Sequence, residues 1–108
     1  MSNTDKIRQL NDELRTTLIG GRIVLTHGVQ SLGEAMVMRL LFLMQQYDNF
    51  TEDNDVYKEH DFGMIELQGR KYFWKIDYYD RDYQMHSPNP ADPTVTNRVL
   101  TLMLAEEY

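Results

Sequence analysis

The sequence contains no cysteine and no long apolar run. Without cysteine, disulfide scaffolds, thiolate metal sites and cysteine nucleophiles are excluded. The longest unbroken apolar run, residues 40–44, is too short to span a membrane, and residues 1–14 have no apolar segment typical of a secretory signal. We therefore expect a cytoplasmic protein with no membrane association, and its 108 residues predict a single domain, 1–108.

The chain also lacks an excess of positive charge. It carries 17 acidic and 11 basic side chains, a formal net charge of −6. Because proteins that bind nucleic acid through phosphate contacts need clustered lysine and arginine, we expect no direct binding of nucleic acid. Glycine-rich phosphate loops, serine nucleophile elbows and zinc-binding helix motifs are all missing, so we expect no cofactor and no metal.

The first half of the chain predicts a helix followed by a strand. Apolar residues recur at steps of three and four from Ile7 to Leu18, which indicates an amphipathic helix over 5–18. The glycines at 20–21 predict its end, because glycine readily adopts the left-handed conformation. The short, β-branched segment 22–26 then predicts a strand.

A second helix is predicted over 32–47. Ser31 and Glu34 have the spacing of a capping box, in which each side chain bonds a backbone N–H of the first turn. The helix is apolar over most of its girth, which is typical of a central core helix or of a helix with one face against a partner. The second interpretation leaves open a homodimer through helix 32–47.

Residues 61–68 and 71–79 predict a β-hairpin around Gln68-Gly69. A two-residue turn sets the register, with Glu66 opposite Lys71 and His60 opposite Asp77. One face of the hairpin then belongs to the core. The residues expected on that face are Ile65, Leu67, Tyr72, Trp74 and Ile76.

The end of the chain predicts a third helix over 94–107, opened by Asp92-Pro93, with an apolar stripe at Val95, Val99 and Leu102-Met103. The fold class is then α+β. We expect a small antiparallel sheet, a strand plus a β-hairpin, packed against three helices in the order α-β-α-β-β-α.

Acid and aromatic residues share one stretch of chain. Residues 48–83 hold ten acidic and five basic side chains, and residues 47–83 hold ten of the twelve aromatics. One interpretation is a solvated acidic loop beside an aromatic core. The other is a surface that binds a basic groove of another protein. The candidate binding residues are Asp48, Glu52, Asp53, Asp55, Tyr57, Glu59, Tyr78, Tyr79, Asp80, Asp82 and Tyr83.

Metal binding has little support in the sequence. Asp53-Asn54-Asp55 begins like a calcium loop, but Lys58 stands where the sixth-position glycine is required, and Met64 stands where the bidentate glutamate belongs. A magnesium or manganese ion on Asp61, Glu66 or Asp77 stays open but unspecific.

One catalytic hypothesis rests on the hairpin. His60, Glu66, Lys75 and Asp77 are expected on one hairpin face, where carboxylates beside a lysine would suit a metal-dependent nuclease or another hydrolase. The alternative is that these side chains form solvent-exposed cross-strand pairs. We expect the alternative, and therefore no enzymatic activity.

Several sequence segments, spread over nearly the whole chain, resemble those of one protein family. They are GGRIVLT (20–26), FTEDND (50–55), EHDFG (59–63), FWKIDYYD (73–80) and PADPTVTNRVLTLMLAEEY (90–108), and they resemble the bacterial domain-of-unknown-function family 3768. The resemblance implies a small protein from plasmid or mobile-element genes and carries no site residues. Such a setting suits an anti-defence protein of the anti-restriction or anti-CRISPR type.

The sequence thus favours a non-catalytic acidic module that binds a basic surface of a nucleic-acid-handling protein. Carboxylates take the place of phosphates in such an interaction. The hairpin hydrolase and a structural homodimer remain as alternatives.

Overall fold

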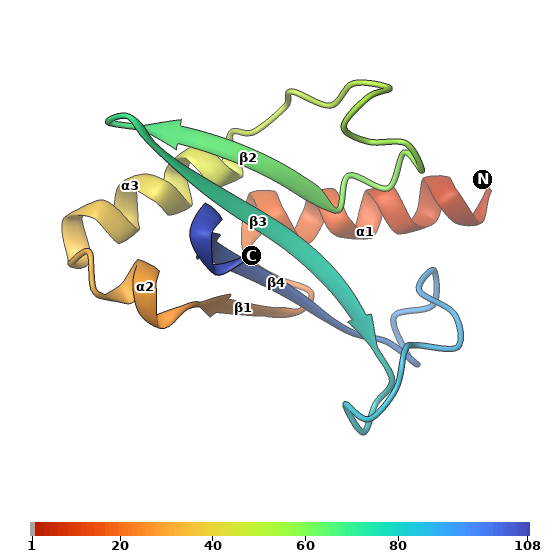
Figure 1. Ribbon diagram of the computed structural model, residues 1–108. Coiled ribbons are helices and arrows are strands. Elements are labelled where there is room, and N and C mark those ends of the chain that lie inside the picture. The colour runs from red at the N-terminus through yellow and green to blue at the C-terminus, as the bar shows by residue number, and fades with distance from the viewer. Residues whose placement is uncertain (1) are drawn as a thin grey trace.

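The computed structural model describes residues 2–108 as a four-stranded mixed sheet with helices packed against one face (Figure 1). The strand order is β1-β4-β3-β2, with β1 parallel to β4 and the other neighbours antiparallel. The predicted α+β class is confirmed. The elements are α1 (Asn3–Thr17), β1 (Arg22–Leu25), α2 (His27–Gln30), α3 (Glu34–Gln45), β2 (Phe62–Leu67), β3 (Arg70–Tyr79), β4 (Asn97–Leu104) and the 3-10 turn η1 (Ala105–Glu107).

The predicted helix over 94–107 is wrong, because residues 97–104 form strand β4. This strand lies between β1 and β3, and six of its eight residues are buried. A strand buried on both faces loses the alternation of apolar and polar residues, so its sequence cannot be told from a helix by periodicity. Asp92 caps no helix, and its carboxylate accepts from the N–H and hydroxyl of Thr94 instead.

Helix α1 begins where Ser2 accepts a hydrogen bond from the Asp5 N–H at 3.1 Å. It ends at Leu18, whose φ of 63° is left-handed and whose N–H donates to the Leu14 carbonyl at 2.8 Å. The prediction that the glycines at 20–21 end this helix is therefore wrong. Gly21 instead allows close packing, since a Cβ there would lie 2.4 Å from the Arg98 carbonyl oxygen.

The hairpin register is confirmed from Phe62 opposite Lys75 to Leu67 opposite Arg70. Gln68 and Gly69 both have positive φ, 55° and 76°, which is the geometry of a type I′ turn. The predicted pairing of His60 with Asp77 is wrong. His60 has a φ of 55° and turns away from the hairpin before β2 begins.

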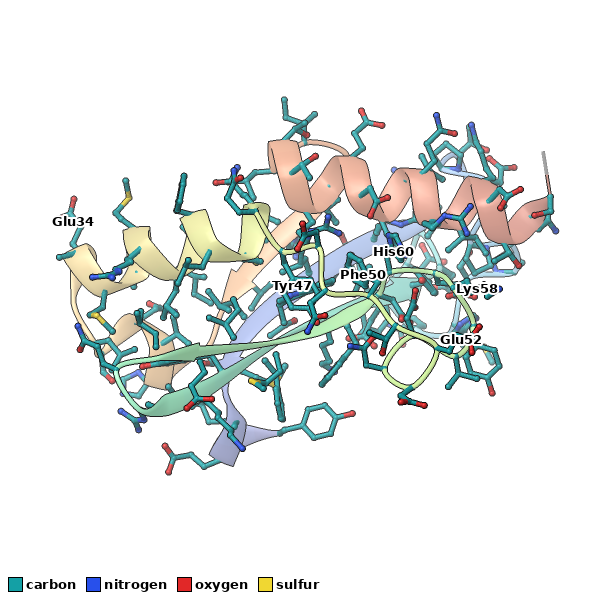
Figure 2. All side chains as sticks on the ribbon, turned by 90° about the horizontal axis from the view of Figure 1, so that it is seen from above. Glu34, Tyr47, Phe50, Glu52, Lys58 and His60 are labelled. Atoms are coloured by element: carbon teal, nitrogen blue, oxygen red, sulfur yellow. The ribbon has the colours of Figure 1, made fainter. Side chains whose placement is uncertain are left out.

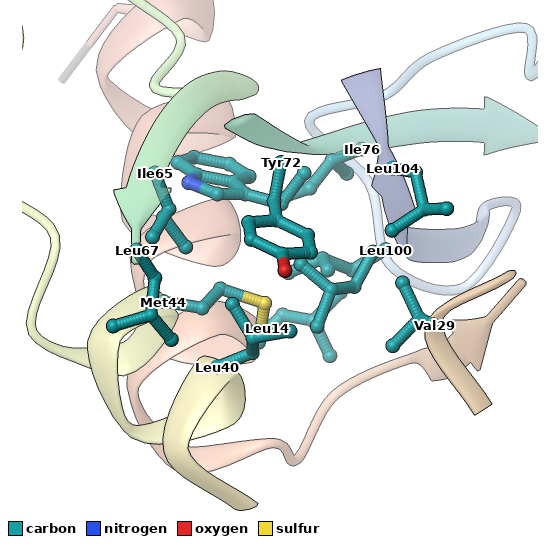
Figure 3. Packing of buried hydrophobic residues seen from close by; sticks show 12 residues of the cluster. Leu14, Val29, Leu40, Met44, Ile65, Leu67, Tyr72, Ile76, Leu100 and Leu104 are labelled. Atoms are coloured by element: carbon teal, nitrogen blue, oxygen red, sulfur yellow. The ribbon is translucent and has the colours of Figure 1, made fainter. Parts of the chain in front are cut away.

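The core lies between the sheet and the helices. Figure 3 shows Leu14, Leu40 and Met44 from the helices facing Ile65 and Tyr72 from the hairpin. All of the predicted core residues of the hairpin are buried, and Trp74 is fully inaccessible. The other face of the sheet, which we call the outer face, carries the alternate residues such as Phe73 and Lys75.

Helix α3 contributes only one side to this core. Leu40 and Met44 are fully buried, while Met38 and Phe42 are 63% and 59% exposed. The predicted capping box is also wrong, since the N-cap residue of α3 is Gly33 and no side chain caps the helix. In residues 2–108, no helix has the length and apolar character needed to cross a membrane.

Candidate functional site

The segment between α3 and β2, residues 46–61, is here named the acidic loop. It contains no helix or strand, but hydrogen bonds between its own polar groups stabilise its shape. The Thr51 N–H donates to the Asn54 side chain at 2.8 Å, and the Asn54 N–H donates back to the Thr51 hydroxyl at 3.2 Å. The Asn54 amide also donates to the Asn49 carbonyl at 2.8 Å. The loop therefore holds a defined shape at its centre.

Helix α1 forms hydrogen bonds with the C-terminal half of the acidic loop and so holds it against the rest of the protein. The Arg8 guanidinium donates to the Lys58 carbonyl at 3.0 Å, and the Asn11 amide donates to the Glu59 carbonyl at 2.9 Å. Figure 2 shows Phe50 and His60 of the loop beside this helix. Each contact joins residues about fifty positions apart in the chain, so none of them is visible as a sequence motif.

The ring of His60 lies between two carboxylates. Its Nδ1 is 2.9 Å from an Asp12 oxygen, and its Nε2 is 3.5 Å from an Asp55 oxygen. Asp55 is only 8% exposed and also accepts from the His60 N–H at 3.1 Å. A neutral imidazole has one N–H, so only the doubly protonated ring can donate to both carboxylates. These three residues form an internal clamp for the loop.

Aromatic stacking joins the clamp to the core. His60 lies flat on Phe50, with ring centroids 3.7 Å apart and planes within 5°. The guanidinium of Arg15 lies over the Phe50 and Trp74 rings, 5.1 and 5.4 Å from their centroids, and pairs with Asp12 at 3.0 Å. Arg15 is only 5% exposed, so this ion pair is shielded on the arginine side.

A second network runs from the loop to the sheet. The Tyr78 hydroxyl donates to the Glu59 carboxylate at 2.8 Å and accepts from the Asn11 amide at 2.8 Å. Asn11 in turn accepts from the buried Arg98 at 2.7 Å. Burial raises the pKa of Tyr78 strongly, so its hydroxyl stays a donor. Burial and the nearby Glu59 also raise the pKa of Asp61.

These networks divide the predicted binding residues of the loop into two groups. Asp55 and Glu59 are used internally, as is Tyr78 of β3. The predicted side chains of the loop left for a partner are Asp48, Glu52, Asp53 and Tyr57, and the structure adds Val56, which is not among the predicted residues. Val56 and Tyr57 are apolar or aromatic and are 68% and 79% exposed. The acidic loop thus presents carboxylates around an exposed apolar tip.

The other predicted binding segment lies elsewhere. Tyr79, Asp80, Asp82 and Tyr83 belong to the end of β3 and the turn after it, which Figure 1 shows on the opposite side of the sheet from the acidic loop. The Tyr83 ring lies under Arg22 of β1, at the far edge from β2. The structure therefore does not bring the two segments together into one surface.

A comparison with protein families identifies what the chain is related to. A family model described as a protein of unknown function (DUF3768) matches residues 25–107. The chain belongs to the DUF3768 family. No curated protein and no solved structure matches it. The matched range of this DUF3768 protein includes the acidic loop and the turn after β3, and helix α1 precedes it.

The catalytic constellation expected on the hairpin is not assembled in this DUF3768 protein. Lys75 pairs with Asp77 at 3.0 Å on the outer face, and the hydrogen bond raises the pKa of Lys75. Glu66 lies on the same face, but His60 is clamped against α1 on the helix side. Within the described residues 2–108, no three His, Asp or Glu side chains are arranged to hold a metal ion.

Sequence reasoning missed the residues that hold the acidic loop in place. Asn11, Asp12 and Arg15 stand on the inner side of α1, where polar residues interrupt the apolar stripe of the helix. Arg98 likewise interrupts the apolar run of β4. A polar residue at a position that the periodicity assigns to the core is the one signal that points to such a network.

Proposed function

We propose that this DUF3768 protein is a non-catalytic, cytoplasmic interaction module whose acidic loop binds a basic surface of another protein. The observation that carries the proposal is that the tip of the loop, Val56 and Tyr57, is exposed while the loop itself is held in a defined shape. A sixteen-residue irregular loop is unusual in a small domain unless it is functional or disordered, and this one is pinned by hydrogen bonds to itself and to α1.

The pinned loop reduces the entropy lost on binding. A flexible segment must be ordered when its partner arrives, whereas residues 46–61 already hold their shape through Thr51, Asn54 and the His60 clamp. Tyr57 offers a large contact area at little rotamer cost, and Val56 adds apolar surface beside it. The loop tip therefore has the properties of a preorganised recognition element.

The carboxylates at the tip favour a basic partner. Asp48, Glu52 and Asp53 are exposed and have no ion-pair partner within residues 2–108. Such charges speed association with a positive surface and reject acidic ones. A groove that normally holds nucleic-acid phosphates has the complementary charge, so we propose a nucleic-acid-handling protein as partner, in keeping with an anti-defence role.

Affinity capture from cells of the source organism tests this function. The loop variant carries Asp48→Asn, Glu52→Gln, Asp53→Asn and Tyr57→Ser. A matched control removes three charges elsewhere, with Glu13→Gln, Glu34→Gln and Glu66→Gln, all at exposed positions. We expect a partner that the native and control proteins retain at low salt, that the loop variant loses, and that duplex DNA displaces.

The same capture experiment is repeated at high salt concentration. Exposed charges are screened within about 3 Å at about 1 M salt, so capture should fall sharply there. A partner that the loop variant retains as well as the native protein does, or that DNA fails to displace, contradicts the proposal.

The homodimer alternative rests on α3. Met38 and Phe42 are one turn apart on this helix and both are mostly exposed, which is typical of a helix with an unpartnered face. Light scattering separates the two functions. We expect the mass of the 12.8 kDa monomer, and a stable dimer abolished by Met38→Glu with Phe42→Glu would establish the alternative instead.

A further inference from the structure

A polar cavity of about 350 Å³ lies at the end of the sheet where β1 and β4 begin and β3 ends. Its wall includes the backbone of Gly20 and Gly21, the side of Tyr83, and three arginines, Arg22, Arg81 and Arg98. No carboxylate lines it. The volume is at the lower end of the range for small-molecule sites, about 300–1,000 Å³.

The three arginines form a positively charged cluster in a protein whose net charge is negative. The chain has 11 basic and 17 acidic side chains, and several of its other cations form ion pairs, such as Arg15 with Asp12 and Arg70 with Glu106. Within residues 2–108, none of the three cavity arginines is within ion-pair distance of a carboxylate. None of the three is therefore neutralised by a direct ion pair with the described residues.

Two of these arginines are held in position by neutral groups. Arg81 donates to the Asn97 side chain at 2.8 Å, and the Asn97 amide donates to the Asp80 and Arg81 carbonyls at 3.0 Å each. The guanidinium of Arg22 lies 5.0 Å from the centre of the Tyr83 ring. Asn97 and Tyr83 orient these guanidinium groups without neutralising them, which leaves both charges available to a ligand.

The third arginine, Arg98, is buried and forms hydrogen bonds with groups of the protein itself. Arg98 is 3% exposed, and its Nε and Nη2 donate to Asn11 and to the Pro90 carbonyl at 2.7 and 2.5 Å. It lines the cavity as part of β4 and adds a buried positive charge beside it. Gly20, with a φ of 104°, has open space where a side chain would stand, so a ligand can approach the backbone there.

We propose that this cavity binds a small oxyanion ligand, a phosphate or carboxylate group, through Arg22 and Arg81. Guanidinium groups bind both kinds of oxyanion through paired, charge-assisted hydrogen bonds. The mainly polar wall suits a compact, strongly hydrated ligand. The site lies at the opposite edge of the sheet from the acidic loop, so it is a different surface from the one proposed above for partner binding.

Titration of the isotope-labelled protein, followed by nuclear magnetic resonance, tests the site. The probes are inorganic phosphate, pyrophosphate and citrate, each at constant ionic strength set with chloride. We expect saturable shifts of the Gly20, Gly21 and Asn97 amides. The probe that saturates at the lowest concentration decides between phosphate and carboxylate chemistry.

Three variants make the test specific. Arg22→Gln and Arg81→Gln should each weaken binding at least tenfold, whereas Arg39→Gln, which removes an exposed charge on α3, should leave it unchanged. Thermal unfolding shows whether the variants remain folded. Shifts that do not saturate for any probe, or that all three variants weaken equally, overturn the proposal in favour of general charge screening.

Discussion

Asn11 joins three parts of the molecule through one carboxamide. It is fully buried, donates to Glu59 of the acidic loop and Tyr78 of β3, and accepts from Arg98 of β4. A buried amide with all of its partners satisfied stabilises one arrangement, because any alternative leaves several polar groups without partners. This residue couples the position of the acidic loop to the stability of the fold.

The first prediction follows from this coupling. Asn11→Leu keeps the size of the side chain but leaves the Nε of Arg98 buried without an acceptor, so we expect the free energy of unfolding to fall by about 3–4 kcal/mol. Urea denaturation followed through the single tryptophan, Trp74, measures the loss. Gln9→Leu, on the exposed side of α1, is the control and should change stability by less than about 0.5 kcal/mol. Equal stability of the two variants would contradict the network.

A second prediction at this scale concerns pH. The pKa of Asp61 is raised above its ordinary value of 3.8 by burial and by Glu59. The folded state then holds its proton more tightly than the unfolded state, so this group lowers stability as pH rises from 3.8 through its folded pKa. Asp61→Asn should therefore stabilise the protein at neutral pH and lose this advantage at a pH below 3.8. Denaturation at both pH values checks this, and a benefit that persists in acid would refute it.

At the scale of elements, the hairpin β2–β3 depends on a glycine opposite a tryptophan. Gly63 pairs with Trp74, and a Cβ on Gly63 would lie 2.3 Å from the Trp74 Nε1. The indole fills the space that a side chain at 63 would need, and its N–H has no partner among residues 2–108. The close fit therefore rests on shape alone.

The third prediction tests this fit. Gly63→Ala should cost about 1–3 kcal/mol, because the rigid indole ring must move to make room for the added methyl group. Met64→Ala, on the outer face of the same strand, should cost much less because Met64 is 39% exposed. Thermal unfolding of the two variants measures the difference, and comparable costs would show that position 63 has room.

The elements that could be predicted from the sequence are those whose pattern is local. Helix α1, strand β1 and the hairpin register follow from periodicity and from the Gln68-Gly69 turn. Strand β4 could not be predicted, because its inner face packs against the helices and Val99 and Met103 on its outer face are buried as well, which produces an apolar run with helical spacing. In the same way, the run of charge locates the acidic loop, but its anchors on α1 are residues 48 to 50 positions away in the chain.

On the scale of the whole molecule, the two proposed sites divide the charge between them. The acidic loop lies beside β2 at one edge of the sheet, and the arginine cavity lies where β1 begins at the other. The net charge of −6 does not reveal that negative and positive side chains gather at different edges of the sheet, because acidic residues outnumber basic ones overall. Ligands of opposite charge are therefore expected at opposite edges.

The place of β4 in the sheet has a consequence for how the protein is made. The last strand in the sequence lies between β1 and β3, and pairs residue 22 with residue 99. During synthesis on the ribosome, the first strand and the hairpin emerge before their common neighbour, so the sheet closes only after β4 has been made. A chain that stops at residue 96 is expected to remain unfolded, with rapid proteolysis and no protected core amides.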